Sequence, residues 1–263
     1  MTASQDDLAL ALKLADVADA ITLARFRAAD LVVETKPDLT PVSEADTAVE
    51  RTLRERLASA RPGDAIVGEE YGSSQAGETG RRWIVDPIDG TKNYVRGIPV
   101  WATLLALEEG GQLTVGVVSA PALHRRWWAA RGQGAFGSDG LAPEPRRLGV
   151  SGVRALEDAQ LVMSGFDGWD EQARLEQLIA LSRACWRTRG FGDFWGYMLV
   201  AEGVAEVYCE AVVSLWDLAA PLLIVEEAGG TFTDLGGVRT PEGGDALASN
   251  GVLHEAALAL VRR

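Results

Sequence analysis

Helical and extended segments alternate in mixed order along this chain, and that order restricts its fold more than any other feature. Apolar residues at helical spacing mark residues 5–29, and short apolar runs typical of strands occupy 65–68, 82–86, 101–108, 113–120 and 126–130. After residue 160, expected strands at 161–163, 186–189, 205–209, 231–233 and 246–248 are interleaved with expected helices at about 170–184, 193–203, 216–228 and 252–261. This order favours a layered α/β or α+β fold over a helix bundle or a barrel.

The length of 263 residues allows one large domain or two closely packed halves. We expect an N-terminal α+β half over residues 1–145 and a C-terminal α/β half over residues 146–263, because the segment 137–147 is polar and contains prolines. The two halves are expected to form one compact unit.

Two local signals define element ends in the N-terminal half. Ser43 stands three residues before Asp46, a capping pattern which predicts that a helix begins there and runs to about residue 60. Residues 72–80 are polar and contain glycine, so we expect a mobile loop.

The formal net charge of −13 argues against nucleic-acid binding, because such affinity comes largely from Lys and Arg side chains that neutralise phosphates. The sequence has no apolar run of 18 residues that could span a membrane, and Asp6 and Asp7 do not fit a signal peptide. We therefore expect a cytoplasmic protein that binds neither nucleic acid nor membrane.

Histidine and cysteine are scarce. His124 and His254 are the two histidines, and Cys185 and Cys209 match no zinc or redox spacing. A histidine-based triad or a zinc site therefore has little to build on, and acid–base chemistry would fall to carboxylates, hydroxyls and metal-bound water.

Carboxylates stand where apolar segments end. Asp86 and Asp89 follow the apolar run 83–85, Glu69 follows the run 65–68, and Asp217 opens an expected helix. Each alone has an ordinary explanation, since aspartate is common in turns and at helix N-termini. Together they are typical of converging oxygen ligands for a hard cation, which would also remove the repulsion between crowded carboxylates.

These residues resemble the inositol monophosphatase superfamily of metal-dependent, lithium-sensitive phosphatases. The family's core motif is matched by Asp86-Pro87-Ile88-Asp89-Gly90-Thr91, and residues 38–46, 68–70, 216–230 and 248–251 also fit, in the family's order. The resemblance covers nearly the whole chain. It implies a layered α-β-α-β-α sandwich of the inositol monophosphatase and fructose-1,6-bisphosphatase type, assembled as a homodimer.

The resemblance also implies a metal site. One Mg²⁺ ion would be held by Glu69, Asp86 and the Ile88 carbonyl, and a second by Asp86, Asp89 and Asp217. A third, weaker ion is expected near Glu69, and Lys36 is expected to lie over the site in a loop.

The implied chemistry is hydrolysis of a phosphate monoester by water. The Mg²⁺ ions would neutralise phosphate oxygens, lower the pKa of a bound water and stabilise the leaving alkoxide. Glu69 and Thr91 would orient that water, Asp46 would polarise the threonine hydroxyl, and Gly90 and Thr91 would offer backbone N–H groups to the phosphate. We favour direct in-line attack over a phospho-enzyme, because no carboxylate of the set is free of metal duty and also in a nucleophile motif.

Three flanking segments, 91–101, 119–130 and 187–194, resemble the actinobacterial branch of histidinol-phosphate phosphatases. The implied substrate, L-histidinol phosphate, carries an ammonium group and an imidazole, which suit carboxylates and aromatic faces. Glu210 would bind the ammonium with Asp193 as a second candidate, Asn250 would meet the imidazole, and Arg189 would hold the substrate or brace Glu210.

Other interpretations stay open at this point. Glu210 also fits a solvated strand end and Asp193 a helix cap, and the tryptophans at 101, 127 and 128 fit a core as well as a substrate platform. The alternative function is an inositol-1-monophosphatase or a broader sugar or nucleotide phosphatase. A more remote one is a non-catalytic protein that binds metal or phosphate.

Overall fold

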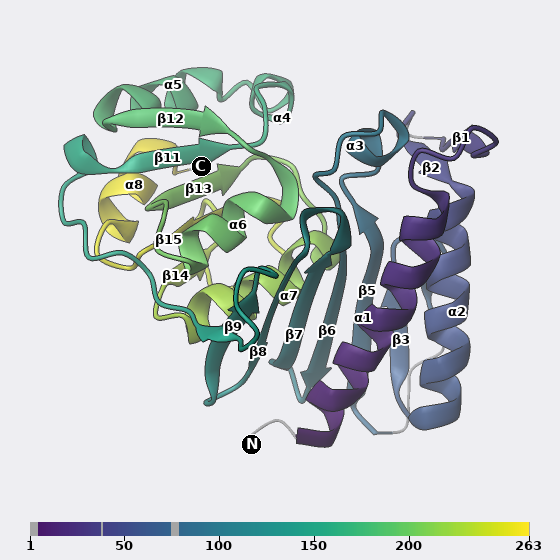
Figure 1. The fold of residues 1–263 in the computed structure, drawn as a ribbon. Coiled ribbons are helices and arrows are strands. Elements are labelled where there is room, and N and C mark those ends of the chain that lie inside the picture. Colours follow the sequence, from purple (N-terminus) through teal and green to yellow (C-terminus); the bar gives the residue numbers. More distant parts are fainter. Residues whose placement is uncertain (1–4, 38, 75–78, 263) are drawn as a thin grey trace.

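The computed structural model describes residues 5–37, 39–74 and 79–262 (Figure 1). Asp38, in one of the family motifs, and residues 75–78, in the expected loop 72–80, lie outside this part. No helix in the described ranges is long and apolar enough to cross a bilayer.

Eight strands of the described chain form a large sheet in the order β10-β9-β8-β7-β6-β5-β3-β4. They are β3 (Ala65–Gly68), β4 (Gly72–Ser73), β5 (Arg81–Asp89), β6 (Ala102–Glu109), β7 (Gln112–Ala120), β8 (Arg125–Ala130), β9 (Gly134–Ser138) and β10 (Arg146–Arg147). A separate hairpin pairs β1 (Val33–Thr35) with β2 (Pro41–Ser43). Within the large sheet β3 and β5 are parallel, so their carboxyl ends lie at the same edge.

Two long helices, α1 (Gln5–Arg25) and α2 (Glu44–Ala60), cover one face of the large sheet (Figure 1). Side chains of β5 alternate between the two faces: Trp83 and Val85 pack with α1 and α2, whereas Ile84 belongs to the core on the other side. Ser43 caps α2 in a capping box with Asp46, as its sequence predicts.

A second, five-stranded sheet has the order β12-β11-β13-β15-β14. Its strands are β11 (Gln160–Met163), β12 (Arg187–Gly190), β13 (Val207–Glu210), β14 (Thr231–Thr233) and β15 (Ala246–Ser249). On its outer side, α5 (Leu175–Ala184) and α8 (His254–Val261) bury leucines against β11 and β13.

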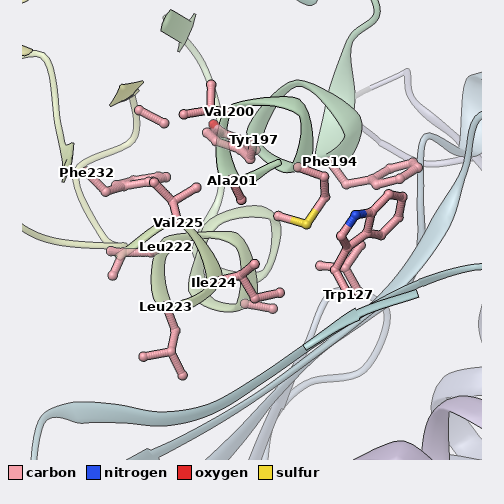
Figure 2. Packing of buried hydrophobic residues seen from close by; sticks show 14 of the residues in the cluster. Trp127, Phe194, Tyr197, Val200, Ala201, Leu222, Leu223, Ile224, Val225 and Phe232 are labelled. Carbon is pink, nitrogen blue, oxygen red and sulfur yellow. The ribbon is translucent and has the colours of Figure 1, made fainter. Parts of the chain in front are cut away.

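The middle layer consists of α6 (Asp193–Ala201) and α7 (Leu215–Glu227). Figure 2 shows Tyr197 and Val200 of α6 near Leu222 and Val225 of α7, with Phe232 of β14 beside them. The same apolar cluster includes residues of both sheets. Helices, large sheet, helices, small sheet and helices therefore follow one another, which confirms the expected α-β-α-β-α sandwich. The division at residue 145 stays a prediction, because both halves share this core.

Some element limits differ from those predicted. The first helix ends at Arg25 rather than near residue 29, and Arg27 adopts a left-handed φ of 61°. The helix expected at 170–184 is split into α4 (Asp167–Glu171) and α5, with Ala173 at a φ of 55° between them. Strand β9 was not expected, because its glycine-containing sequence lacks a strong apolar pattern.

Candidate active site

Strand β5 continues past its expected end and carries two carboxylates into the middle of the molecule. Its pairing with β6 shifts between Asp86 and Asp89, where Pro87 falls in the irregularity. Proline fits there because a bulge does not need its missing N–H. The Thr103 hydroxyl donates to the Pro87 carbonyl at 2.8 Å and fixes the distortion.

A third carboxylate reaches the same place from the first turn of α7. Ser214 is the N-cap of that helix, and Asp217 completes the capping box by accepting a hydrogen bond from the Ser214 N–H at 2.7 Å. Asp89 in turn accepts from the Phe194 N–H, at the start of α6, at 2.6 Å. Oxygen atoms of Asp86, Asp89 and Asp217 all lie within 4.8 Å of one another.

This donor set fits a hard cation. The side chain of Asp86 is buried, and its Oδ1 has no hydrogen-bond partner among the described residues. Burying a carboxylate oxygen without a hydrogen-bond partner costs free energy of folding, unless another group such as a metal ion binds it. Carboxylate oxygens are the ligands that Mg²⁺ and Ca²⁺ prefer.

Glu69 lies beside this group, in the turn between β3 and β4, and its charge acts on Asp86. The Lys36 ammonium, from the loop between β1 and β2, bridges Glu69 and Glu70 with two contacts of 2.7 Å. The structure thus places Lys36 over Glu69.

Thr91 opens the short helix α3 (Thr91–Val95) next to the carboxylates. Its hydroxyl oxygen lies 3.0 Å from Asp46 Oδ1 and 2.9 Å from the Ile88 carbonyl oxygen. Gly90 has a φ of 84°, and a Cβ there would approach the Val100 carbonyl oxygen to 3.0 Å. Glycine therefore lets the chain turn from β5 into α3 with Thr91 facing Asp46.

A cavity of about 140 Å³ adjoins the three clustered carboxylates. It is lined by Asp89, Asp193, Phe194, Tyr197, Glu210, Val212, Val213 and Asp217. Asp193 begins α6 and also accepts from the Asn93 amide at 3.0 Å, so it is both a helix-end residue and a wall of the cavity. Glu210 is only 8% exposed and accepts from the Tyr197 hydroxyl at 2.7 Å, which rules out a solvated strand end.

Two residues expected at the substrate do not line this cavity. The Asn250 amide donates to Ser151 and Val153, and its oxygen accepts from the Leu253 N–H, so it ties a loop together and does not line the cavity. Arg189 is exposed on β12 and donates to the carbonyl of its neighbour. Sequence patterns cannot place such residues, because both positions depend on how the small sheet packs.

Tyr197 and Asn93 line or brace the cavity and were not anticipated. Tyr197 follows Asp193 by four residues, the spacing that puts two side chains on one face of a helix, so a helical pattern could have indicated it. Asn93 gave no such signal. The tryptophans at 101 and 127 are core residues, as their alternative interpretation had it.

Burial and mutual repulsion disfavour the charged forms of these carboxylates. Burial, and then the charges of Glu69 and Asp193 respectively, raise the pKa of Asp86 and of Asp89 well above the ordinary value. Burial raises the pKa of Asp217 to about 6, against the opposing Ser214 N–H bond, and that of Glu210 to about 7.

The metal-free protein should therefore lose stability as pH rises. A carboxyl whose pKa is raised by folding contributes stability that is complete below its unfolded pKa, roughly 4, and is lost as pH passes the folded values near 6 and 7. With a chelator present, we expect a lower melting temperature at about pH 8 than at about pH 5, and a larger rise on adding Mg²⁺ at the higher pH. Equal effects of Mg²⁺ at both pH values would contradict this.

Comparison with known proteins agrees with this geometry. The model of the "Inositol monophosphatase family" matches residues 4–263. A histidinol-phosphatase of Mycobacterium tuberculosis is 57% identical over 97% of each chain, and an inositol-1-monophosphatase of Mesorhizobium japonicum is 35% identical over 84% of this chain and 83% of the other. The extragenic suppressor protein suhB of Bartonella henselae has a solved structure that superposes with a TM-score of 0.90 at 29% identity, covering 98% of this chain and 99% of that one.

The predicted resemblance, including its histidinol-phosphatase branch, is confirmed by these matches. They run along nearly the whole chain, and the range of the family model spans the end of β5. The chain belongs to the inositol monophosphatase family.

Proposed function

We propose that this chain is a Mg²⁺-dependent phosphomonoesterase that hydrolyses L-histidinol phosphate to L-histidinol and phosphate. The observation that carries the proposal is the acidic cavity that opens directly beside the three clustered carboxylates. A phosphate ester bound at the cluster would place the rest of its molecule against Asp193 and Glu210. Strong identity to a protein named histidinol-phosphatase supports this choice of substrate.

The metal would be held by Asp86, Asp89, Asp217, Glu69 and the Ile88 carbonyl. When bound, Mg²⁺ supplies charge neutralisation at the phosphate, an acidified water and stabilisation of the leaving oxygen. We propose two ions for each site, with a third, weaker one at Glu69. The Lys36 ammonium already pairs with Glu69 and Glu70, so occupation of that third place would require it to move.

Thr91 and Asp46 are the two residues proposed to orient the attacking water. Asp46 is fully buried and accepts from the Ser43 N–H at 2.8 Å, which fixes its carboxylate. The Thr91 hydroxyl has a single proton and can donate either to Asp46 or to the Ile88 carbonyl. With the Ile88 oxygen engaged by metal, the proton would go to Asp46, and a lone pair of Thr91 would then accept from the attacking water together with Glu69.

The cavity suits a cationic leaving group. Asp193 and Glu210 are the two carboxylates that line it without belonging to the clustered set. An ammonium placed between them would stabilise their charged forms, which burial disfavours. An inositol-1-monophosphatase is the second candidate, since Glu210 with Tyr197 also suits ring hydroxyls. Inositol carries no positive charge, however, so Asp193 would then have no charged partner from the substrate.

Phosphate release from a panel of esters tests the proposal. We expect kcat/KM for L-histidinol phosphate to exceed those for inositol 1-phosphate, glycerol 2-phosphate and AMP by at least about 100-fold, the ratio that a buried polar recognition site can give. Activity should require Mg²⁺ and fall when Li⁺ is added. Equal rates on all esters would contradict the substrate assignment, and Mg²⁺-independent hydrolysis would contradict the metal site.

Homodimeric assembly and a cytoplasmic location remain predictions. Arg189, which is exposed on the edge strand β12, would serve the substrate only if assembly or loop movement brings it to a cavity. The molar mass in solution, compared with the 28.1 kDa of one chain, checks the first of these predictions.

A further inference from the structure

A buried glutamate lies under the turn that carries Glu69. Glu50 belongs to α2, and its side chain is completely buried. Its Oε2 accepts from the Glu70 N–H at 2.7 Å, and its Oε1 accepts from the Tyr71 N–H at 3.1 Å. Both donors are in the turn of the β3–β4 hairpin, whose strands could not satisfy them.

Residues around this contact are adapted to it. A Cβ on Gly68 would lie 2.1 Å from Glu50 Oε1, so only glycine allows the helix side chain to reach the turn. Arg54, one turn later on α2, pairs with Glu50 at 2.8 Å and also donates to the Gly72 carbonyl. The charge of the buried carboxylate is therefore compensated, and the hairpin is bound to α2 on both sides of its turn.

The consequence concerns Glu69, the first residue of that turn. Its N–H donates to the Val85 carbonyl at 3.2 Å, next to Asp86. Its backbone is thus fixed to β5 on one side and, through Glu70 and Tyr71, to Glu50 on the other. Lys36 pairs with the Glu69 side chain, but a turn whose backbone is not fixed could still carry Glu69 away from a cluster that repels it.

We propose that Glu50, with Arg54, is a positioning residue that holds Glu69 against the carboxylate cluster and so strengthens Mg²⁺ binding. This inference rests on the proposed metal site. Glu50 itself contacts neither metal nor substrate. It acts by fixing the backbone of a ligand, which is how residues behind a metal site commonly raise affinity by about 10- to 100-fold.

Glu50→Gln tests this role with little change of volume. An amide has one accepting oxygen, so at least one turn N–H loses its partner and the pair with Arg54 loses its charge. We expect the Mg²⁺ dissociation constant, measured by calorimetry on the chelator-treated protein without substrate, to rise about tenfold. The Mg²⁺ concentration for half-maximal activity should rise with it, while kcat at saturating Mg²⁺ changes less than about threefold.

Glu206→Gln is the matched control. Glu206 is also buried and also accepts from a backbone N–H, that of Gln160 at 2.6 Å, but in the small sheet. It should lower the melting temperature without changing Mg²⁺ affinity. Equal Mg²⁺ affinity of Glu50→Gln and the unmodified protein, or an equal loss in both variants, would overturn the positioning role.

Arg54→Gln provides the same test if Glu50→Gln does not fold. Its side chain is nearer to solvent, and we expect about a threefold weaker Mg²⁺ affinity; no change would overturn the inference. Failure of the unmodified protein to bind Mg²⁺ would show that the metal site is wrong as well. Normal binding by the unmodified protein with no effect of either variant would leave the metal site standing and the role of Glu50 disproved.

Discussion

Asp89→Asn is expected to lower Mg²⁺-dependent phosphatase activity by at least about a thousandfold, because it removes the charge of a proposed metal ligand. The fold should survive, since an asparagine oxygen can still accept from the Phe194 N–H that Asp89 binds at 2.6 Å. Phosphate release at saturating substrate measures the loss, and calorimetry should show weakened Mg²⁺ binding.

The melting temperature of the Asp89→Asn variant distinguishes loss of metal binding from damage to the fold. Asp89 is half-buried near Asp193, Asp217 and Glu210, and its removal from water and then these charges raise its pKa. Removing its charge relieves that repulsion, so the chelated variant should melt at a higher temperature than the unmodified protein, with a smaller rise on adding Mg²⁺.

Asp139→Asn is the control. Asp139 likewise accepts a hydrogen bond from a backbone N–H, that of Leu141 at 3.0 Å, but it lies in a surface loop far from Asp89 in the sequence. It should leave both activity and Mg²⁺ response unchanged. Full Mg²⁺-dependent activity in Asp89→Asn would refute the metal role of Asp89.

Glu210→Gln is expected to reduce kcat/KM for L-histidinol phosphate by roughly 30- to 150-fold, which corresponds to about 2–3 kcal/mol for a buried charge-assisted contact. The amide keeps the size of the side chain and can still accept from the Tyr197 hydroxyl, which Glu210 binds at 2.7 Å. What it loses is the negative charge that would face the substrate ammonium.

An uncharged leaving group is the control for this variant. With glycerol 2-phosphate, Glu210→Gln should stay within about threefold of the unmodified enzyme, because that ester has no ammonium to lose its partner. An equal loss on both esters would mean that Glu210 supports the metal centre or the fold rather than substrate choice. Burial places the pKa of Glu210 near 7, so the preference for the cationic ester should also strengthen as pH rises through that value.

Much of the architecture follows from local patterns. The period of apolar residues predicts strands in the order in which they occur, and Ser43 with Asp46 predicts the start of α2, because capping depends only on residues three apart. Predictions failed where the local signal was weak: the break at Ala173 that separates α4 from α5, and the glycine-containing strand β9.

The lining of the cavity is the part that sequence patterns reach least. Glu210 and Asp193 are named by resemblance, but their place in the cavity results from α6 lying between the two sheets. Asn250 shows the reverse case. Its motif lies close to the C-terminal end, yet its amide is used to bind the loop at Ser151 and Val153.

By itself the sequence determines the chemistry that is available: carboxylates at the ends of apolar strands, a glycine that allows the turn into α3, and few histidines or cysteines to offer anything else. Only the tertiary structure decides which of these groups meet. Asp217 reaches Asp86 and Asp89 because α7 packs against the large sheet, and Glu50 supports Glu69 because Gly68 leaves room for it. The reason is physical: a local pattern depends on neighbours along the chain, whereas close contact between distant residues depends on how whole layers bury their apolar faces.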